Sequence, residues 1–155
     1  MVPRFARLGA VSALIVSLWS STASAALPCG TLLEHETWGG HTLARHVAKS
    51  RTFLQSRLDD EGIFAASTFA SESSAVTVIA AALDSASDLD TWKVTRQGTA
   101  RKVIKFKASA VTGKSLTQRH ETTDPLSDVK GVTVVLQKAA NKCKYRIVTA
   151  FPARL

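Results

Sequence analysis

The sequence predicts an α+β fold, with short helices in the N-terminal part packed on an antiparallel β-sheet formed by the C-terminal part. Apolar residues recur at helical spacing as far as Trp92, and at every second position in several segments after it. Helices that precede a run of strands are typical of α+β rather than alternating α/β organisation. The 155 residues contain no internal repeat, so we expect a single folded domain.

Residues 1–25 have the pattern of a secretory signal peptide. Arg4 and Arg7 form a basic start, residues 9–19 are mostly apolar, and small residues at positions 23–25 form a cleavage site. The apolar run is shorter than the roughly 20 residues that span a bilayer. We therefore predict an exported protein, secreted or periplasmic, that has no membrane partner.

The remaining chain is predicted to consist of an irregular lead-in, residues 26–38, and a folded domain, residues 39–155. Its two cysteines, Cys29 and Cys143, lie near its two ends. In an oxidising compartment we expect them to form a disulfide, which contributes on the order of 4 kcal/mol in the chain-entropy model. Two buried free thiols are the alternative.

The charge of the chain indicates a polyanionic partner. The net charge is +8, and removing residues 1–25 takes away two arginines and no acids, which leaves +6. A basic surface gains free energy by releasing counterions from RNA, DNA or an anionic membrane. Charge alone does not choose among these partners, because many exported proteins are basic without binding nucleic acid.

Two short helices joined by a bend are predicted within residues 38–58. Residues 42–48 are good helix formers, and Thr52 and Gln55 match a capping box that would begin a second helix. The bend then falls near Ser50. Residues 63–69, which are apolar and β-branched, should follow as a strand or an extended linker.

The longest helix is predicted at residues 72–86, where apolar residues repeat at helical spacing. Its expected role is burial. Apolar and polar residues then alternate in three predicted strands, at residues 104–108, 132–136 and 145–151. A turn at Asn141-Lys142 would join the last two strands, and the polar, glycine-containing stretch 112–131 is predicted to be a long loop.

Two histidines, His41 and His46, lie five positions apart at the start of the first helix. Five residues advance a regular helix by about 500°, so the two side chains should lie about 140° apart and cannot bind one metal ion. His35 and His120 offer no ligand spacing either. We predict no metal site.

The sequence favours acid–base chemistry on phosphate esters over other hydrolytic mechanisms. It has no G-x-S-x-G motif, P-loop or dinucleotide fingerprint, and the acidic run at residues 59–61 is typical of a solvated helix end. RNA supplies its own nucleophile, the 2′-hydroxyl, so an enzyme needs a base, a cation for the developing charge and a hydrogen-bond donor. His46, Arg57 and Thr149 could fill these three roles.

The predicted bend makes this grouping feasible. On one continuous helix His46 and Arg57 would lie about 16 Å apart, too far to hold one phosphate. A bend near Ser50 lets the second helix fold back toward the first. Thr149 and Phe151 are two residues apart on a predicted strand, so they point to the same face, which could meet both helices.

Several segments between residues 39 and 152 form a collinear pattern that is more specific than any one of them. They are GHTLARHV at residues 40–47, L-x-x-R-L at 54–58, ASTF at 66–69, a helix before Trp92, VVL at 134–136 and IVTAFP at 147–152. Together they resemble the bacterial ribonuclease A-like domain found at the C-terminal ends of contact-dependent growth inhibition toxins.

The resemblance implies an RNase A-like α+β fold and metal-independent RNA cleavage without a cofactor. The family's catalytic histidine, arginine and threonine correspond to His46, Arg57 and Thr149. Where the family usually has a tyrosine two residues after the threonine, this chain has Phe151, which lacks the hydroxyl and keeps the stacking surface. His41 is then a candidate second donor, although packing at the start of the helix is its simpler role.

Further basic residues are candidates for contacts with the RNA backbone, or else belong to a solvated face of the sheet: Lys105, Lys107, Lys144 and Arg146. We expect a monomer with RNA as its partner, and the resemblance adds a cognate immunity protein. One alternative is a weakly active or inactive relative that binds RNA or a partner protein. Another is a basic protein that acts on membranes.

Overall fold

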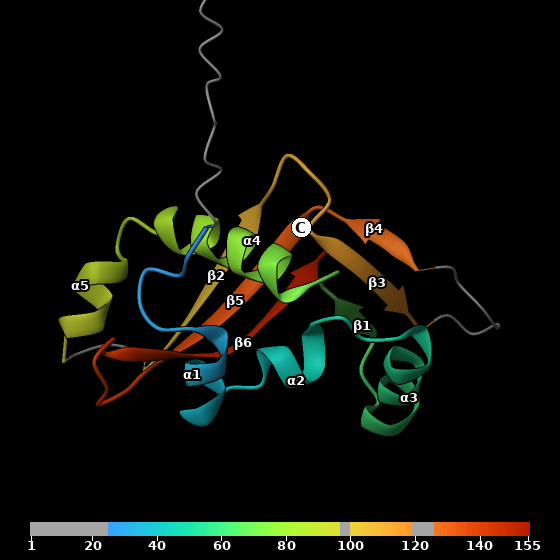
Figure 1. Cartoon of the computed structure of the whole chain (residues 1–155), viewed down its shortest axis with the longest axis horizontal. Helices are drawn as coiled ribbons and strands as arrows, with labels where there is room; N and C mark the ends of the chain where they lie inside the picture. The colour runs from blue at the N-terminus through green and yellow to red at the C-terminus, as the bar shows by residue number, and fades with distance from the viewer. Residues whose placement is uncertain (1–24, 97–99, 119–125) are drawn as a thin grey trace, which may run out of the picture.

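The computed structural model describes residues 25–96, 100–118 and 126–155 (Figure 1). Within these ranges, five helices and two three-stranded antiparallel sheets confirm the predicted α+β class. Residues 1–24 of the predicted signal peptide and His120 lie outside the described residues. None of the described helices is long and apolar enough to cross a membrane.

The larger sheet contains the three predicted strands, now bounded as β2 (Arg101–Lys107), β5 (Gly131–Lys138) and β6 (Tyr145–Ala153). Their order is β2-β5-β6, and the last two strands form the predicted hairpin. The longest helix, α4 (Glu72–Asp84), packs across β2 and β5, as Figure 1 shows. These predictions are confirmed.

The two faces of this sheet differ because successive side chains of a strand point to opposite sides. One face belongs to the core beneath α4, where a row of buried residues crosses the strands: Ile104, Val134 and Ala150. The next row lies on the opposite face: Lys105, Thr133 and Phe151. A basic, a hydroxyl and an aromatic side chain therefore lie side by side on the face away from α4.

The smaller sheet corrects the prediction of a long loop at residues 112–131. Two of its strands lie in that stretch, in the order β1 (Ala65–Thr68), β3 (Gly113–Thr117) and β4 (Ser127–Val129). Gly113 is buried so closely that a Cβ atom there would lie 2.5 Å from both the Thr68 carbonyl oxygen and Pro152 Cγ. The small residues that resemble a loop are therefore required by packing.

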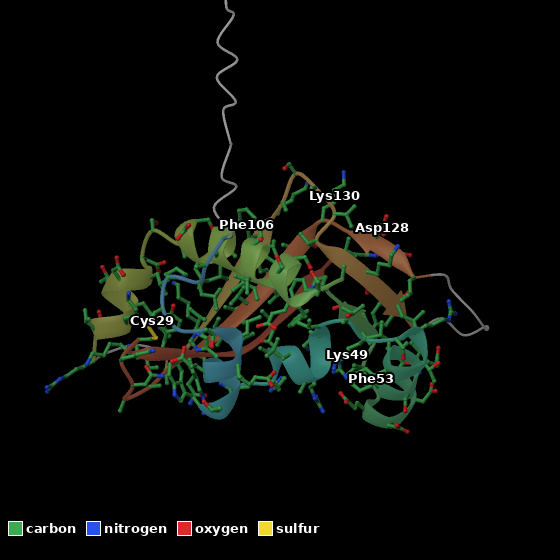
Figure 2. All side chains as sticks on the ribbon, viewed as in Figure 1. Cys29, Lys49, Phe53, Phe106, Asp128 and Lys130 are labelled. Atoms are coloured by element: carbon green, nitrogen blue, oxygen red, sulfur yellow. A yellow bond between two sulfur atoms is a disulfide. The ribbon has the colours of Figure 1, made fainter. Side chains whose placement is uncertain are left out.

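The predicted bend near Ser50 is confirmed, but its capping group differs from the prediction. Helix α2 (Thr42–His46) ends before the bend and α3 (Arg51–Glu61) begins after it, with the Ser50 hydroxyl accepting a hydrogen bond from the Phe53 amide at 3.1 Å. The predicted capping box at Thr52 and Gln55 is wrong. Lys49 Nζ lies 5.3 Å from the centroid of the Phe53 ring, which ties the bend to α3 (Figure 2).

Two helices lie where the sequence did not predict them. α1 (Leu32–Thr37) occupies the stretch predicted to be irregular, and a capping box between Thr31 and Glu34 begins it. α5 (Leu89–Val94) lies between α4 and β2. α1 is stable despite its six residues because it is fastened to the sheet.

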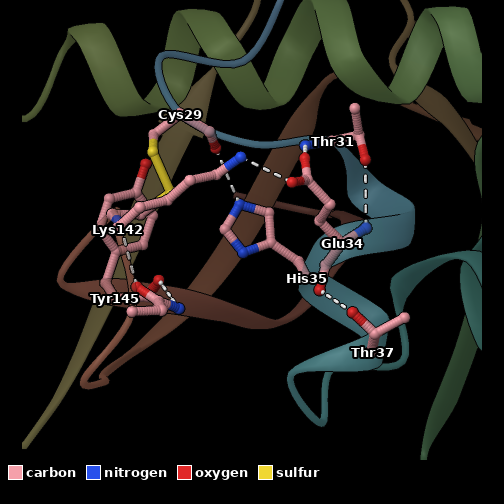
Figure 3. A network of polar contacts seen from close by, with 9 residues as sticks. Cys29, Thr31, Glu34, His35, Thr37, Lys142 and Tyr145 are labelled. Carbon is pink, nitrogen blue, oxygen red and sulfur yellow. Dashed lines mark hydrogen bonds and ion pairs between the residues drawn. A yellow bond between two sulfur atoms is a disulfide. The ribbon is translucent and has the colours of Figure 1, made fainter.

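We call residues 29–38 the N-terminal clasp, because they hold the β5–β6 hairpin (Figure 3). The predicted disulfide is confirmed, since Cys29 and Cys143 are bonded. Glu34 forms an ion pair with Lys142 at 2.6 Å. The His35 ring is buried within this network and stacks on Tyr145, with the ring centroids 5.7 Å apart.

The N-terminal helices also cover the outer edge of β6, which would otherwise expose unpaired backbone groups. The Ile147 amide donates to His35 Nδ1 at 3.1 Å, and the Ala150 amide donates to the Thr42 hydroxyl at 3.0 Å. Between them, the His41 amide donates to the Val148 carbonyl at 2.9 Å. These bonds place α2, with His41 at its N-cap and His46 at its end, directly beside β6.

Candidate active site

His46 is buried at the end of α2 between the two sheets, with 7% of its surface exposed. Its Nδ1 lies 3.1 Å from the Ser67 carbonyl oxygen, which can only accept, so Nδ1 carries the proton of the neutral ring. Nε2 then keeps its lone pair. The ring also packs on Phe151, with the centroids 5.4 Å apart.

The surroundings of His46 favour its neutral form. Its pKa is lowered to about 4, mainly by burial; the hydrogen bond to Ser67 opposes this shift, and the positive charge of Arg57 adds to it. At neutral pH the ring is therefore uncharged, with Nδ1 anchored and Nε2 able to take up a proton.

His41 lies close to His46, contrary to the predicted angle of about 140° between the two side chains. Their ring centroids are 6.5 Å apart. The helical calculation fails because His41 is the N-cap, with a φ of −154°, and lies outside the five-residue helix. Burial and the charge of Arg45 lower the pKa of His41 as well.

Among the described residues, no three His, Cys, Asp or Glu side chains are grouped so that they could hold a metal ion.

Arg57 reaches this site from α3. Its positive charge contributes to the lowered pKa of both His41 and His46, which places the guanidinium within electrostatic range of the two rings. Arg57 Nε and Nη2 donate to the two carboxylate oxygens of Glu61, at 3.1 and 3.0 Å. Nη1 is buried and has no hydrogen-bond partner among the residues that the structure describes. The bend thus brings the arginine toward the histidines, as expected.

Thr149 lies on β6, two residues before Phe151 and on the same face. Its hydroxyl is also buried without a partner. Among the described residues, three buried side-chain polar atoms lack a partner: Arg57 Nη1, Thr149 Oγ1 and the Tyr145 hydroxyl. A buried polar group without a partner costs about 1–3 kcal/mol. Two of these three atoms belong to the predicted catalytic residues, which is typical of a site that binds a polar ligand.

Comparisons with known proteins identify the family of the chain. Residues 40–152 match the family model described as "Bacterial CdiA-CT RNAse A domain". The chain belongs to this family. The matched region contains the whole site, from His41 to Phe151, and begins after the N-terminal clasp. Membership places the chain in a family of RNase A-like toxin nucleases.

A solved structure has the same fold. It is the crystal structure of a CdiA-CT/CdiI complex from Y. kristensenii 33638, which is 24% identical in sequence and has a TM-score of 0.64. The alignment covers 74% of this chain and 99% of that chain. A comparison with curated proteins finds no match. The likeness confirms the fold class of this RNase A-like domain.

The basic candidates of this CdiA-CT domain lie in different surroundings. Lys105 is exposed in the row that contains Phe151, and Lys107 follows it on β2. Lys144 lies in the β5–β6 connection with a positive φ of 63°. Arg146 on β6 contacts the clasp, because it donates to the Trp38 carbonyl, and it also donates to Gln137 Oε1 on β5. Lys105 is thus the candidate that shares a row with the site.

One residue of the site was not predicted. Glu61 belongs to the acidic run at residues 59–61 that the sequence predicts as a solvated helix end. In the structure Glu61 pairs with Arg57 and also with Arg45, at 3.1 Å. The spacing of four residues between Arg57 and Glu61 on one helix is the signal that could have identified this pair.

Proposed function

We propose that this chain is a metal-independent ribonuclease that cleaves RNA through its own 2′-hydroxyl. One observation supports it most strongly. A buried neutral histidine, His46, has Nδ1 anchored to Ser67, while its Nε2 has no hydrogen bond to another described residue. The charge of Arg57 acts on its pKa, and Thr149 lies on the same face of β6 as Phe151, on which the His46 ring packs. Among the described residues, Arg57 Nη1 and Thr149 Oγ1 are buried without hydrogen-bond partners.

In this proposal His46 Nε2 takes the proton from the 2′-hydroxyl while O2′ attacks phosphorus. The P–O5′ bond breaks, and the products are a 2′,3′-cyclic phosphate and a free 5′-hydroxyl. Arg57 Nη1 and the Thr149 hydroxyl donate to the non-bridging oxygens as their charge grows. The bound phosphate raises the pKa of His46 from its low value, because a nearby negative charge favours the imidazolium.

The leaving O5′ needs a proton, and His41 is the candidate donor because its ring lies beside His46. The lowered pKa of His41 leaves little of its charged form at neutral pH. Phe151 supplies a ring but no hydroxyl at the position where the family usually has tyrosine. We therefore expect a slow enzyme, in which water or His41 completes the proton transfer.

Cleavage assays in EDTA test the proposal. Residues 26–155, which contain every described helix and strand, should convert RNA into products with 2′,3′-cyclic phosphate ends, and His46→Ala should abolish the reaction. The proposal fails if RNA remains intact at every protein concentration. It also fails if His46→Ala cleaves as well as the unsubstituted chain.

The alternative is a catalytically weak or inactive domain that binds RNA or a partner protein, and Phe151 favours it. Phe151→Tyr separates the two. If the substitution creates an activity that the natural chain lacks, the binding function is supported. If the natural chain already cleaves RNA, the enzyme is supported, and tyrosine should only raise its rate.

We further propose that the protein is an exported monomer, secreted or periplasmic, that acts as an interbacterial toxin. Its domains would be a signal peptide (1–25), a lead-in (26–38) and the RNase A-like domain (39–155), with RNA backbone contacts from the basic candidates Lys105, Lys107, Lys144 and Arg146. The disulfide is compatible with an oxidising compartment. The CdiA-CT/CdiI complex supports a cognate immunity protein as a partner. A mature N-terminus at Ala26 and a monomeric mass in solution are the expected observations.

A further inference from the structure

Glu61 joins the two helices that form the site. It is the last residue of α3, and its carboxylate binds Arg57 of the same helix and Arg45 of α2. The Arg57 contact is a two-bond fork, from Nε at 3.1 Å and from Nη2 at 3.0 Å. The Arg45 contact measures 3.1 Å. One carboxylate therefore crosses the bend at Ser50 and holds both arginines.

The fork determines where the rest of Arg57 points. A guanidinium is planar, with five donor hydrogens in fixed directions, so fixing Nε and Nη2 also fixes Nη1. Nη1 is the atom that is buried and has no partner. The Arg57 side chain is 11% exposed and that of Glu61 is 29% exposed, so the pair is screened less than an ordinary surface ion pair.

We infer that Glu61 is a positioning residue of the site, because it holds Arg57 so that Nη1 is presented to the reacting phosphate. This inference rests on the proposed ribonuclease function. The hydrogen bond from Arg57 also lowers the pKa of Glu61, so the carboxylate stays charged near neutral pH.

The two acidic residues before Glu61, Asp59 and Asp60, serve as a comparison. Asp59 accepts a hydrogen bond from Gln55 at 2.9 Å, and Asp60 accepts one from Ser56 at 2.9 Å. Each bonds a residue four positions earlier on its own helix. Asp60 and Glu61 therefore carry the same charge next to each other, but Asp60 is not bonded to Arg57.

A positioning role and a simple surface role predict opposite changes in activity. Removing a surface carboxylate near an RNA site reduces repulsion and should strengthen binding. Removing Glu61 should have the same effect on binding, yet it should slow the chemical step because Arg57 loses its alignment. A displacement of about 1 Å can cost on the order of 100-fold in rate.

The first measurement does not require cleavage. In the NMR spectrum of residues 26–155, the Nε–H signal of Arg57 should shift and exchange faster with water in Glu61→Gln, and remain unchanged in Asp60→Asn. A 2′-deoxyribo-oligonucleotide, which cannot be cleaved, should perturb this signal in the unsubstituted chain. An unchanged Arg57 signal in Glu61→Gln, or an Arg57 signal that ignores the oligonucleotide, would overturn the inference even if the protein cleaves RNA.

The second measurement uses RNA cleavage. Glu61→Gln should lower kcat roughly 10- to 100-fold while KM stays constant or falls. Glu61→Asp keeps the charge on a shorter side chain, so its kcat should lie between those of the unsubstituted chain and Glu61→Gln. Asp60→Asn should have the kcat of the unsubstituted chain. If Glu61→Gln and Asp60→Asn both raise kcat/KM to a similar extent, Glu61 is only a surface charge. If the unsubstituted chain does not cleave RNA, the ribonuclease proposal fails, and the NMR comparison still decides whether Glu61 positions Arg57.

Discussion

The N-terminal clasp and the candidate active site each place a buried histidine beside β6, and the two histidines are bonded differently. In the clasp, His35 Nε2 donates to the Cys29 carbonyl at 3.1 Å, and Nδ1 accepts from the Ile147 amide at 3.1 Å. In the site, His46 bonds Ser67 through Nδ1, and its Nε2 has no hydrogen bond to another described residue. Both rings are buried and both have a lowered pKa. The free ring nitrogen, rather than burial, distinguishes the candidate catalytic residue.

The same contrast holds for arginine and threonine. Arg146, which holds the clasp, bonds the Trp38 carbonyl and Gln137, whereas Arg57 leaves one buried nitrogen without a partner among the described residues. The Thr42 hydroxyl accepts from a β6 amide, whereas the Thr149 hydroxyl has no partner. Arg146 and Thr42, which fasten the N-terminal segment to β6, are thus bonded within the fold, whereas Arg57 and Thr149 retain hydrogen-bonding capacity for a ligand.

Replacing each histidine by asparagine should separate the two regions most clearly. His46→Asn keeps a donor for Ser67 but loses the free ring nitrogen, so RNA cleavage should fall about 10²- to 10⁴-fold with little loss of stability. His35→Asn cannot reach both Cys29 and Ile147. It should lower the free energy of unfolding by about 1–3 kcal/mol and keep its activity per folded molecule. Urea unfolding and cleavage assays measure both quantities.

A His35→Asn variant that folds fully but is as inactive as His46→Asn would contradict this separation. Circular dichroism at the assay temperature provides the control, because it shows how much of each variant is folded.

Opening the disulfide should affect stability more than activity. Cys29 and Cys143 are 114 residues apart, so in the chain-entropy model their link contributes about 4–5 kcal/mol. Reduction should lower the urea midpoint by a corresponding amount, while the molecules that stay folded still cleave RNA. A Cys29→Ser, Cys143→Ser double variant should match the reduced protein and not respond to reductant. Lost activity at unchanged stability would show that the clasp acts on the site directly.

Mild acid should weaken both regions through their neutral histidines. A histidine with a lowered pKa binds protons more readily in the unfolded chain, so stability is complete above pH 6.5 and is lost as the pH falls below it. For His46, a fall in pKa from 6.5 to about 4 corresponds to about 3 kcal/mol by pH 4. Unfolding free energies measured between pH 7 and pH 4 should show this slope. Each histidine-to-asparagine variant should reduce the slope, and an unaltered slope in both variants would contradict the assignment.

The sequence predicted those parts of the fold in which burial follows a regular period. α4 and β6 bury one face more than the other, and their apolar residues repeat accordingly; the apolar run of β5 reflects a central strand that is buried on both faces over residues 131–134. β3 does not show this pattern, because its inward positions include Gly113 and Ser115, which resemble loop residues. The sequence does contain a signal for the start of α1, because Thr31 and Glu34 have the spacing of a capping box.

For the site, chemistry and family resemblance identified the candidate residues, whereas their geometry depends on packing. The predicted angle between His41 and His46 was wrong because an N-cap does not follow helical geometry. The role of Glu61 also depends on its ion pair with Arg45, which lies on another helix. The spacing of residues along one helix cannot predict such a contact. Sequence spacing predicts pairs within one element well and pairs between elements poorly.

The smallest expected effect tests the threonines. Thr149→Val removes a buried hydroxyl that has no partner, and valine suits a strand. The free energy of unfolding should therefore stay constant or rise by about 1 kcal/mol. Cleavage should fall by roughly tenfold or more, because one donor to the phosphate is lost. Thr42→Val has the same change in shape but leaves the Ala150 amide without an acceptor, so it should lower stability by about 1–3 kcal/mol.

The signs of these two stability changes separate a hydroxyl that is bonded within the fold from one that is kept for a ligand. If Thr149→Val destabilises the protein as much as Thr42→Val, the Thr149 hydroxyl is bonded within the fold and is not held ready for a ligand. If Thr149→Val is at least as stable as the unsubstituted chain and has lost activity, the Thr149 hydroxyl does not stabilise the fold and forms its hydrogen bond only with substrate. Paired urea unfolding curves of the two variants, measured with and without a 2′-deoxyribo-oligonucleotide, decide between these outcomes, because the oligonucleotide should stabilise Thr42→Val more than Thr149→Val.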